Sequence, residues 1–107
     1  MFIAMNQFSV SPGREREFEE GWRTRESYLS GFEGFVHFSL LKSDEAGEYV
    51  SHTIWRSRED FLQWTQSEAF KKAHSVRTAE GVLAGHPRAR FFDAVVAEKG
   101  NLAVLAG

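Results

Sequence analysis

Apolar and polar residues alternate over the first ten positions of the chain. One face of this segment would carry Phe2, Ala4, Asn6, Phe8 and Val10. A period of two residues is typical of a β-strand that buries one of its faces. The pattern therefore predicts a strand over positions 2–10, with the amide of Asn6 set among apolar side chains.

The spacing changes to that of a helix after a turn at positions 11–13. Large side chains recur at intervals of four, three and four, at Phe18, Trp22, Arg25 and Leu29. These intervals place them on one stripe of an amphipathic helix. We predict a helix from Glu15 to about Ser30, capped by Ser11 and ended by Gly31.

Three later segments are rich in β-forming residues and predict strands. They cover positions 35–41, 49–55 and 89–96. A polar loop over positions 43–47 joins the first two as a hairpin. A loop with two glycines over positions 78–88 precedes the last strand. The tail from position 98 ends in an apolar run, which we expect to pack against the domain.

The stretch between the third and fourth strands carries two helix-start signals. Ser57 precedes two acidic residues that suit the positive end of a helix, and Ser67 begins a second signal ten residues later. On one straight helix, Trp64 and His74 would lie nearly a quarter turn apart. A break at Ser67 would let both side chains point into one cavity.

The order strand, helix, strand, strand, helix, strand predicts an α+β fold of the ferredoxin-like βαββαβ type. We expect one domain over residues 1–107. Helices on one side of the sheet would leave its other face without a cover. A second copy of the chain is the simplest cover, so we expect a homodimer that closes a dimeric α+β barrel.

Composition narrows the function classes. The net charge of −2 with mixed signs argues against nucleic-acid binding, and the absence of cysteine excludes disulfides, zinc–thiolate sites and a cysteine nucleophile. No apolar run approaches the roughly 20 residues of a membrane span, and the N-terminus lacks signal-peptide features. We therefore expect a cytoplasmic protein that acts away from the membrane.

Two polar residues have both a structural and a functional interpretation. Asn6 would either bond to a local backbone group or donate a hydrogen bond to a ligand between sheet and helices, because an unpaired buried amide costs roughly 1–3 kcal/mol. His74 would be either a core or rim residue or a ligand of haem iron. A metal held by His74 alone needs a cofactor that supplies its other ligands, as a porphyrin does.

The remaining candidates are less distinctive. Trp22 and Trp64 fit core positions or a ligand pocket, and Arg25 fits a surface position or a contact with a ligand carboxylate. The other histidines make no constellation with carboxylates or serine. The chain has no glycine-rich phosphate-binding motif, no dinucleotide-binding fingerprint and no nucleophile elbow.

Asn6, Trp55-x-Ser57-x-x-x-Phe61-x-x-Trp64 and Ser67-x-x-Phe70-x-x-Ala73-His74 together resemble the IsdG-type haem-degrading monooxygenases. These belong to the antibiotic-biosynthesis-monooxygenase-like superfamily of dimeric α+β barrels. The resemblance covers about residues 1–97 and is most specific between Trp55 and His74. The combination of Asn, Trp and His separates the haem-degrading members from their relatives.

The resemblance implies a role for each matching residue. His74 matches the proximal haem ligand, which binds iron as neutral imidazole, and Asn6 matches the distal amide. Trp64 matches the bulky residue that packs against the porphyrin and forces it out of plane. Trp22 stands where relatives often place a phenylalanine against the haem, and Arg25 is expected near a propionate.

The resemblance also implies the reaction. Haem would be both substrate and cofactor, and haem, O₂ and external electrons would yield a linear tetrapyrrole, iron and a one-carbon product for iron acquisition. The electrons would come from a partner reductase or a small reductant. Three alternatives stay open: a cofactor-free quinol or polyphenol monooxygenase of the same superfamily, a haem carrier without turnover, and a dimeric ligand-binding barrel without haem affinity.

Overall fold

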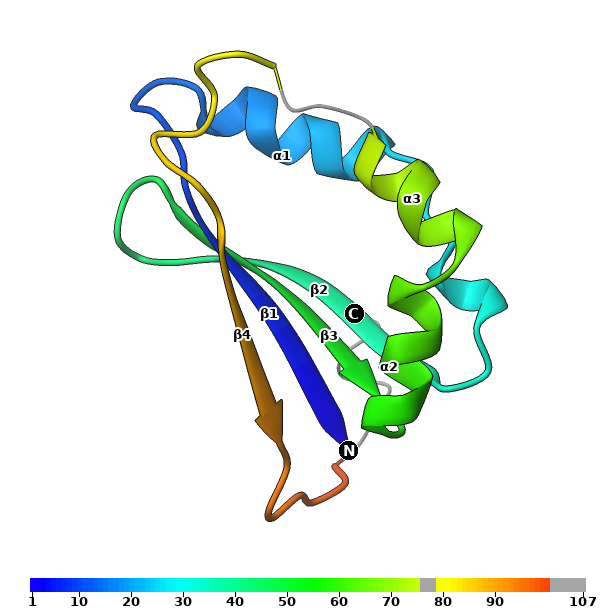
Figure 1. The fold of residues 1–107 in the computed structure, drawn as a ribbon. Coiled ribbons are helices and arrows are strands. Elements are labelled where there is room, and N and C mark those ends of the chain that lie inside the picture. Colours follow the sequence, from blue (N-terminus) through cyan, green and yellow to red (C-terminus); the bar gives the residue numbers. More distant parts are fainter. Residues whose placement is uncertain (76–78, 101–107) are drawn as a thin grey trace.

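The computed structural model describes residues 1–75 and 79–100 of the chain (Figure 1). The elements follow the predicted order and confirm the α+β, ferredoxin-like fold. In sequence they are β1 (Phe2–Ser9), α1 (Glu15–Thr24), the short 3-10 helix η1 (Leu29–Gly31), β2 (Phe35–Lys42), β3 (Glu48–Trp55), α2 (Arg58–Thr65), α3 (Glu68–Ser75) and β4 (Arg88–Asp93).

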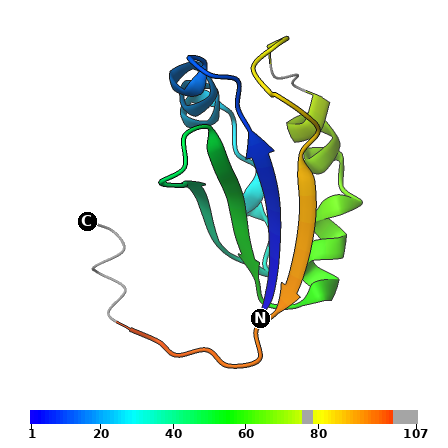
Figure 2. The same cartoon turned by 90° about the vertical axis from the view of Figure 1, so that its left-hand side faces the viewer.

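The four strands form one antiparallel sheet in the order β2-β3-β1-β4. In Figure 1 the helices α1, α2 and α3 arch over one face of this sheet, which we call the inner face. Figure 2 looks onto the outer face, and no helix of the described residues lies in front of it. The expected one-sided cover is confirmed.

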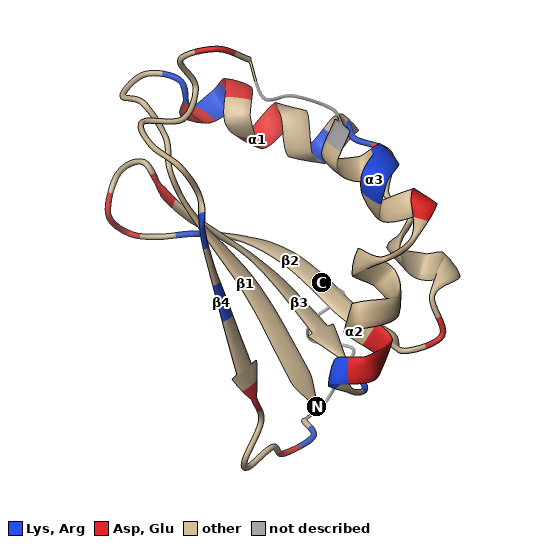
Figure 3. Cartoon of the chain, in the orientation of Figure 1, with Lys and Arg blue, Asp and Glu red and all other residues tan. Residues whose placement is uncertain are grey.

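The alternation in β1 sorts its side chains as predicted. Phe2 and Phe8 are buried on the inner face, Val10 is buried just beyond the strand, and Asn6 is half-buried between them. Ile3 and Met5 point to the outer face. Figure 3 shows that β1 carries no charged residue, whereas charges of both signs alternate along α1.

Two hydrophobic clusters hold the helices to opposite ends of the inner face. The α1 cluster consists of Phe8, Val10, Phe18, Tyr49 and Val82. The α2 cluster consists of Phe2, Leu29, Trp55 and Trp64. Because Phe2 pairs with Trp55 and Phe8 pairs with Tyr49 across β1 and β3, the two clusters sit at the two ends of these strands.

The first helix is shorter than predicted, and its cap is different. It ends at Thr24, because Arg25 is extended (φ −68°, ψ 150°) and its guanidinium donates to the carbonyl oxygen of Trp22 at 3.3 Å. Leu29 therefore belongs to η1 and not to α1. The predicted Ser11 cap is wrong: Gly13 adopts a φ of +84°, and the resulting turn makes Arg14 the N-cap without a side-chain cap bond.

The predicted break between α2 and α3 is confirmed. The Ser57 hydroxyl accepts a hydrogen bond from the backbone N–H of Asp60 at the start of α2. The Ser67 hydroxyl donates to the carbonyl oxygen of Trp64 at 2.6 Å and accepts from the N–H of Phe70 at 3.0 Å. One side chain thus ends α2 and begins α3.

The last strand ends earlier than predicted. β4 pairs only with β1, and its partner strand begins at Phe2, opposite Asp93. The residues after Asp93 therefore have no β1 residue left to pair with, and the side chains of Val95 and Val96 are 93% and 83% exposed. The apolar run at positions 102–105 lies outside the described residues, so the expected packing of the tail is not tested.

The loop before β4 is anchored on the end of β1. Val82 is buried, and its carbonyl oxygen accepts a hydrogen bond from the backbone N–H of Ser11 at 2.7 Å. The backbone N–H of Ala84 donates to the carbonyl oxygen of Ser9 at 2.7 Å. These bonds fix the middle of the loop next to the α1 cluster. None of the helices in the described part of the chain is long and apolar enough to cross a membrane.

Candidate active site

The centre of the inner sheet face carries only small side chains. The strand register brings together Ala4, Asn6, Ser51, Thr53 and Ala89, which we call the central patch. The patch lies between the α1 and α2 clusters, and Asn6 and Ser51 belong to neither. A flat ligand placed against the central patch would contact these small side chains, of which the Asn6 side chain is the amide.

The Asn6 amide has no partner within the described residues. Its backbone takes part in the ladders of both neighbouring strands, opposite Ser51 in β3 and Ala89 in β4. Its side chain is half-buried, and no hydrogen bond to it occurs in the described part of the chain. The amide does not bond to a local backbone group, so both its donor and its acceptor are available to a ligand.

His74 lies near the C-terminal end of α3, and its side chain is exposed. Its Nδ1 atom lies 2.9 Å from the carbonyl oxygen of Phe70. A carbonyl oxygen only accepts, so Nδ1 carries the hydrogen and the neutral ring keeps a lone pair on Nε2. This is the arrangement that metal-binding histidines use, with one nitrogen oriented by a backbone acceptor and the other free to bind.

A metal at His74 would have to bring its other ligands. Among residues 1–75 and 79–100, no three histidine, cysteine or carboxylate side chains gather closely enough to hold a metal ion. A porphyrin iron needs only one axial protein ligand, because four ligands come from the macrocycle. The donor set of the described residues therefore fits haem and not a free-standing metal centre.

Trp64 is buried in the α2 cluster. Its ring stacks on Trp55 with centroids 6.3 Å apart and contacts the edges of Phe32 and Phe70. The Phe70 ring in turn stacks on the His74 imidazole, with centroids 3.9 Å apart. The structure thus joins Trp64 and His74 through one intervening ring, and no direct contact joins either residue to Asn6 in the described part of the chain.

Trp22 and Arg25 form a second group at the other side of the inner face. Trp22 is half-buried and stacks on Phe38 of β2 at 5.6 Å. The Arg25 guanidinium lies 4.8 Å from the Trp22 ring centroid and 4.5 Å from that of Phe38. Partial burial lowers the pKa of Arg25, and none of the described carboxylates pairs with it. A guanidinium without a carboxylate partner is chemically able to bind a ligand carboxylate.

A third polar group fastens α1 to the sheet. The hydroxyl of buried Tyr49 donates to the Glu19 carboxylate, which also lies 3.3 Å from the Lys42 ammonium. Burial and the nearby carboxylate raise the pKa of Tyr49 to about 12, and the hydrogen bond from Tyr49 lowers the pKa of Glu19. We assign this group a structural role, because none of the predicted site residues contacts it.

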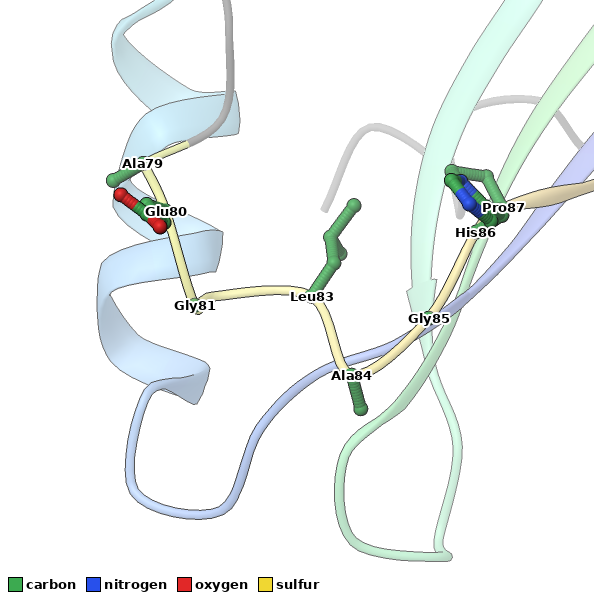
Figure 4. A pocket seen from close by; sticks show the side chains of 8 residues that line it. All are labelled: Ala79, Glu80, Gly81, Leu83, Ala84, Gly85, His86 and Pro87. Atoms are coloured by element: carbon green, nitrogen blue, oxygen red, sulfur yellow. The ribbon is translucent and has the colours of Figure 1, made fainter.

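Two surface hollows lie away from the predicted residues. The first, of about 360 Å³, is formed by the anchored loop (Figure 4); it is lined by Ala79, Glu80, Gly81, Leu83, Ala84, Gly85, His86 and Pro87. The second, of about 440 Å³, is lined by Glu15, Arg16, Glu19, Arg23 and Lys42 beside the Tyr49 hydroxyl. Neither contains a residue expected from the sequence to bind a ligand.

Sequence reasoning missed two parts of the candidate site. The small residues opposite Asn6 come from β3 and β4, and only the strand register brings them beside it. The alternation Tyr49, Ser51, Thr53, Trp55 carried a signal, because two small polar residues interrupt an aromatic face. Phe70 is one position of the stretch that carries the resemblance, but its double contact with His74 depends on ring geometry.

Comparisons with known proteins identify relatives. Residues 1–76 match the family described as "Antibiotic biosynthesis monooxygenase". The curated protein "Heme oxygenase (staphylobilin-producing) 1" of Staphylococcus aureus (strain Newman) is 31% identical over 75 residues, which are 68% of this chain and 70% of the relative. The resemblance to the IsdG-type haem-degrading monooxygenases is therefore confirmed at the level of the family.

Solved structures agree on the fold. MhuD, described as a heme-degrader from Mycobacterium tuberculosis with two hemes bound in its active site, is 26% identical, with a TM-score of 0.75 over 92% of this chain and 100% of that chain. SnoaB, described as a cofactor-independent oxygenase from Streptomyces nogalater, is 21% identical, with a TM-score of 0.70 over 90% and 94%. The fold alone therefore does not choose between these two chemistries.

Proposed function

The chain belongs to the antibiotic biosynthesis monooxygenase family, and on that premise we propose that it is a haem-degrading monooxygenase. The observation that carries the proposal is the His74 ring, whose Nδ1–H is bound to the Phe70 carbonyl while Nε2 is free. A neutral histidine with one ring nitrogen oriented by an acceptor and the other free is the form in which histidine binds haem iron. The relatives described as a heme oxygenase and a heme-degrader support the same choice.

In this proposal the chain's residues surround haem from several elements. His74 binds the iron through Nε2, and the Phe70 carbonyl keeps the proton on Nδ1. The Asn6 amide, which has no partner among the described residues, would donate a hydrogen bond to the ligand from the central patch. Arg25 receives a propionate, because it is the half-buried cation without a carboxylate among the described residues.

Haem supplies the iron centre that reacts with O₂ and the carbon skeleton that is oxidised. The chain's own contribution is then to bind, orient and exclude water, which requires few acid–base side chains. Trp22 and Trp64 supply apolar surface on two sides, and their partners Phe38 and Trp55 hold them in place. The products we propose are a linear tetrapyrrole, iron and a one-carbon fragment, for iron acquisition in a bacterial cytoplasm.

External electrons are required because the sequence offers no flavin or nicotinamide motif. We propose that a partner reductase or a small reductant delivers them.

The outer sheet face supports a homodimer as the working form. Its apolar side chains come from all four strands and include Ile3, Met5, Leu41, Val50, Ile54 and Phe92. They are half-buried or exposed, and no described helix covers them. A second copy placed against this face would bury them and close the barrel, since burial contributes about 25 cal/mol per Å² of apolar surface. Sedimentation at micromolar concentration tests this: a monomer would contradict it.

An optical time course tests the proposed reaction. Ferric haem is titrated into the protein, then ascorbate is added in air with catalase present to remove stray peroxide. We expect a saturable Soret shift followed by its decay into a bilin-like spectrum. A Soret band that persists with a competent reductant would identify a carrier, and no Soret shift would point to a cofactor-free monooxygenase or another ligand.

A further inference from the structure

Phe70 touches His74 in two independent ways. Its backbone carbonyl accepts the Nδ1–H of His74 at 2.9 Å. Its ring lies against the imidazole with centroids 3.9 Å apart and planes 29° apart. In the described part of the chain no other group hydrogen-bonds to His74, and its side chain is exposed. Phe70 is therefore what determines where this imidazole points.

The two contacts constrain different motions. A single Nδ1–H hydrogen bond fixes one ring atom but lets the imidazole plane swing about that bond. A stacked aromatic ring opposes this swing, because tilting the imidazole would either separate the rings or drive them together. Together, the hydrogen bond and the ring stack fix the orientation of the imidazole, and therefore the direction in which the Nε2 lone pair points.

Phe70 is itself held from the side of Trp64. The Phe70 ring meets the Trp64 ring edge to face, with centroids 5.5 Å apart and planes 86° apart. The Ser67 hydroxyl binds the Trp64 carbonyl and the Phe70 N–H, so the two backbones are fastened across the helix break. The position of His74 is therefore set relative to Trp64 and not only relative to α3.

We propose that Phe70 is a positioning residue, whose ring fixes the plane of the His74 imidazole and ties it to Trp64. This inference rests on the proposed function, in which His74 binds the haem iron. Side chains that orient a metal-binding histidine commonly change metal affinity or activity by about 10- to 100-fold when they are replaced. Phe70 acts through His74 and does not need to touch haem.

The test compares two identical substitutions in the same cluster. Phe70→Leu removes the ring stack but keeps the backbone carbonyl that binds Nδ1. Phe61→Leu is the matched control, because the Phe61 ring pairs with the rings of Phe2, Trp55 and Phe91 and, among the described residues, with the ring of neither His74 nor Trp64. Phe70→Tyr keeps the ring and is the conservative rescue.

Two readouts do not depend on turnover. In the protein without haem, the Hε1 resonance of His74 feels the ring current of Phe70, so we expect it to move in Phe70→Leu and to stay in place in Phe61→Leu. In the ferric haem complex, electron paramagnetic resonance reports the imidazole plane, so we expect altered and broadened g values in Phe70→Leu alone. Turnover should fall about 10-fold in Phe70→Leu and recover in Phe70→Tyr.

The outcomes separate this inference from the function beneath it. If His74→Ala leaves the haem spectrum unchanged, His74 is not the ligand, and the proposed function fails together with the inference. If the haem spectrum depends on His74 but Phe70→Leu leaves the resonance and the g values as in Phe61→Leu, only the inference is overturned. A fall in thermal stability shared by both leucine variants, without spectroscopic change, would assign Phe70 to the core alone.

Discussion

Asn6 of β1 lies directly opposite Ser51 of β3 at the centre of the inner sheet face. Ser51 is buried, Asn6 is half-buried, and the Asn6 amide bonds to no described residue. A polar pair set between two aromatic clusters gives the fold little stability by itself. Its position is explained if the amide serves a ligand above the sheet.

Asn6→Ala should keep haem binding and lose most of the turnover. In the proposed function the amide would donate one hydrogen bond to the bound ligand, and removing one aligned donor from a reaction site commonly lowers kcat about 100-fold or more. Single-turnover decay of the Soret band measures it. Gln7→Ala is the control, because Gln7 is the neighbouring amide on the outer face. Equal rates for Asn6→Ala and wild type would remove Asn6 from the site.

Trp64→Phe should allow the bound macrocycle to flatten. The indole is held in place by its contacts with Trp55 and Phe70, and a smaller ring in the same position would leave space. Out-of-plane modes in the resonance Raman spectrum of the haem complex report the distortion. We expect them to weaken in Trp64→Phe. A planar haem in the wild-type complex would contradict the role given to Trp64.

Stability should decline as the solution becomes mildly acidic. Burial, and then the neighbouring His37, lower the pKa of His52, which faces the outer sheet surface with Arg90 two strands away. The folded state disfavours the charged form of His52. The contribution of His52 to the free energy of unfolding is therefore fully present above the unfolded-state pKa of about 6.5, and it is lost as the pH falls through the lower pKa of the folded state.

Urea unfolding at several pH values between 5 and 8 measures this effect. His52→Gln should flatten the decline, and His37→Gln should flatten it partly, because it removes only the charge contribution. If the outer face is the dimer interface, the dissociation constant should rise over the same pH range. Identical pH profiles for His52→Gln and wild type would show that His52 does not cause the decline.

Gly34→Ala should destabilise the fold. A Cβ at Gly34 would lie 2.2 Å from Cγ and 2.3 Å from Cβ of Asp60, at the start of α2. The helix start would have to shift, which we expect to cost about 1–3 kcal/mol. Gly21→Ala is the control: a Cβ there meets nothing within 4 Å, and alanine within α1 should stabilise by about 1 kcal/mol. Equal free energies of unfolding for both variants would contradict this explanation.

Local patterns predicted most of the fold. The alternation in β1, the two β-rich segments of the hairpin, and the serine caps at Ser57 and Ser67 depend on neighbours within a few residues, so the sequence contains them. The predicted element boundaries are wrong where contacts between residues far apart in the sequence determine where an element ends. The first helix ends where Arg25 packs over Trp22 and Phe38, and β4 ends where β1 has no more residues to pair with.

The candidate site was predictable only in part. The resemblance named Asn6, Trp64 and His74, and the pattern around Ser67 placed Trp64 and His74 on two helices. The central patch depends on the register of three strands, and the Phe70–His74 stack depends on side-chain rotamers within α3. Neither quantity can be obtained from the spacing of residues along the chain.

The ferrous haem complex of wild type and of His74→Ala provides the most direct test of the central claim. Resonance Raman spectroscopy detects an iron–histidine stretching band only when an imidazole nitrogen binds the iron. We expect this band in wild type, its loss in His74→Ala, and haem affinity at least about 10-fold weaker in the variant. A band of unchanged frequency and intensity in His74→Ala would show that another residue binds the iron, and would contradict the account.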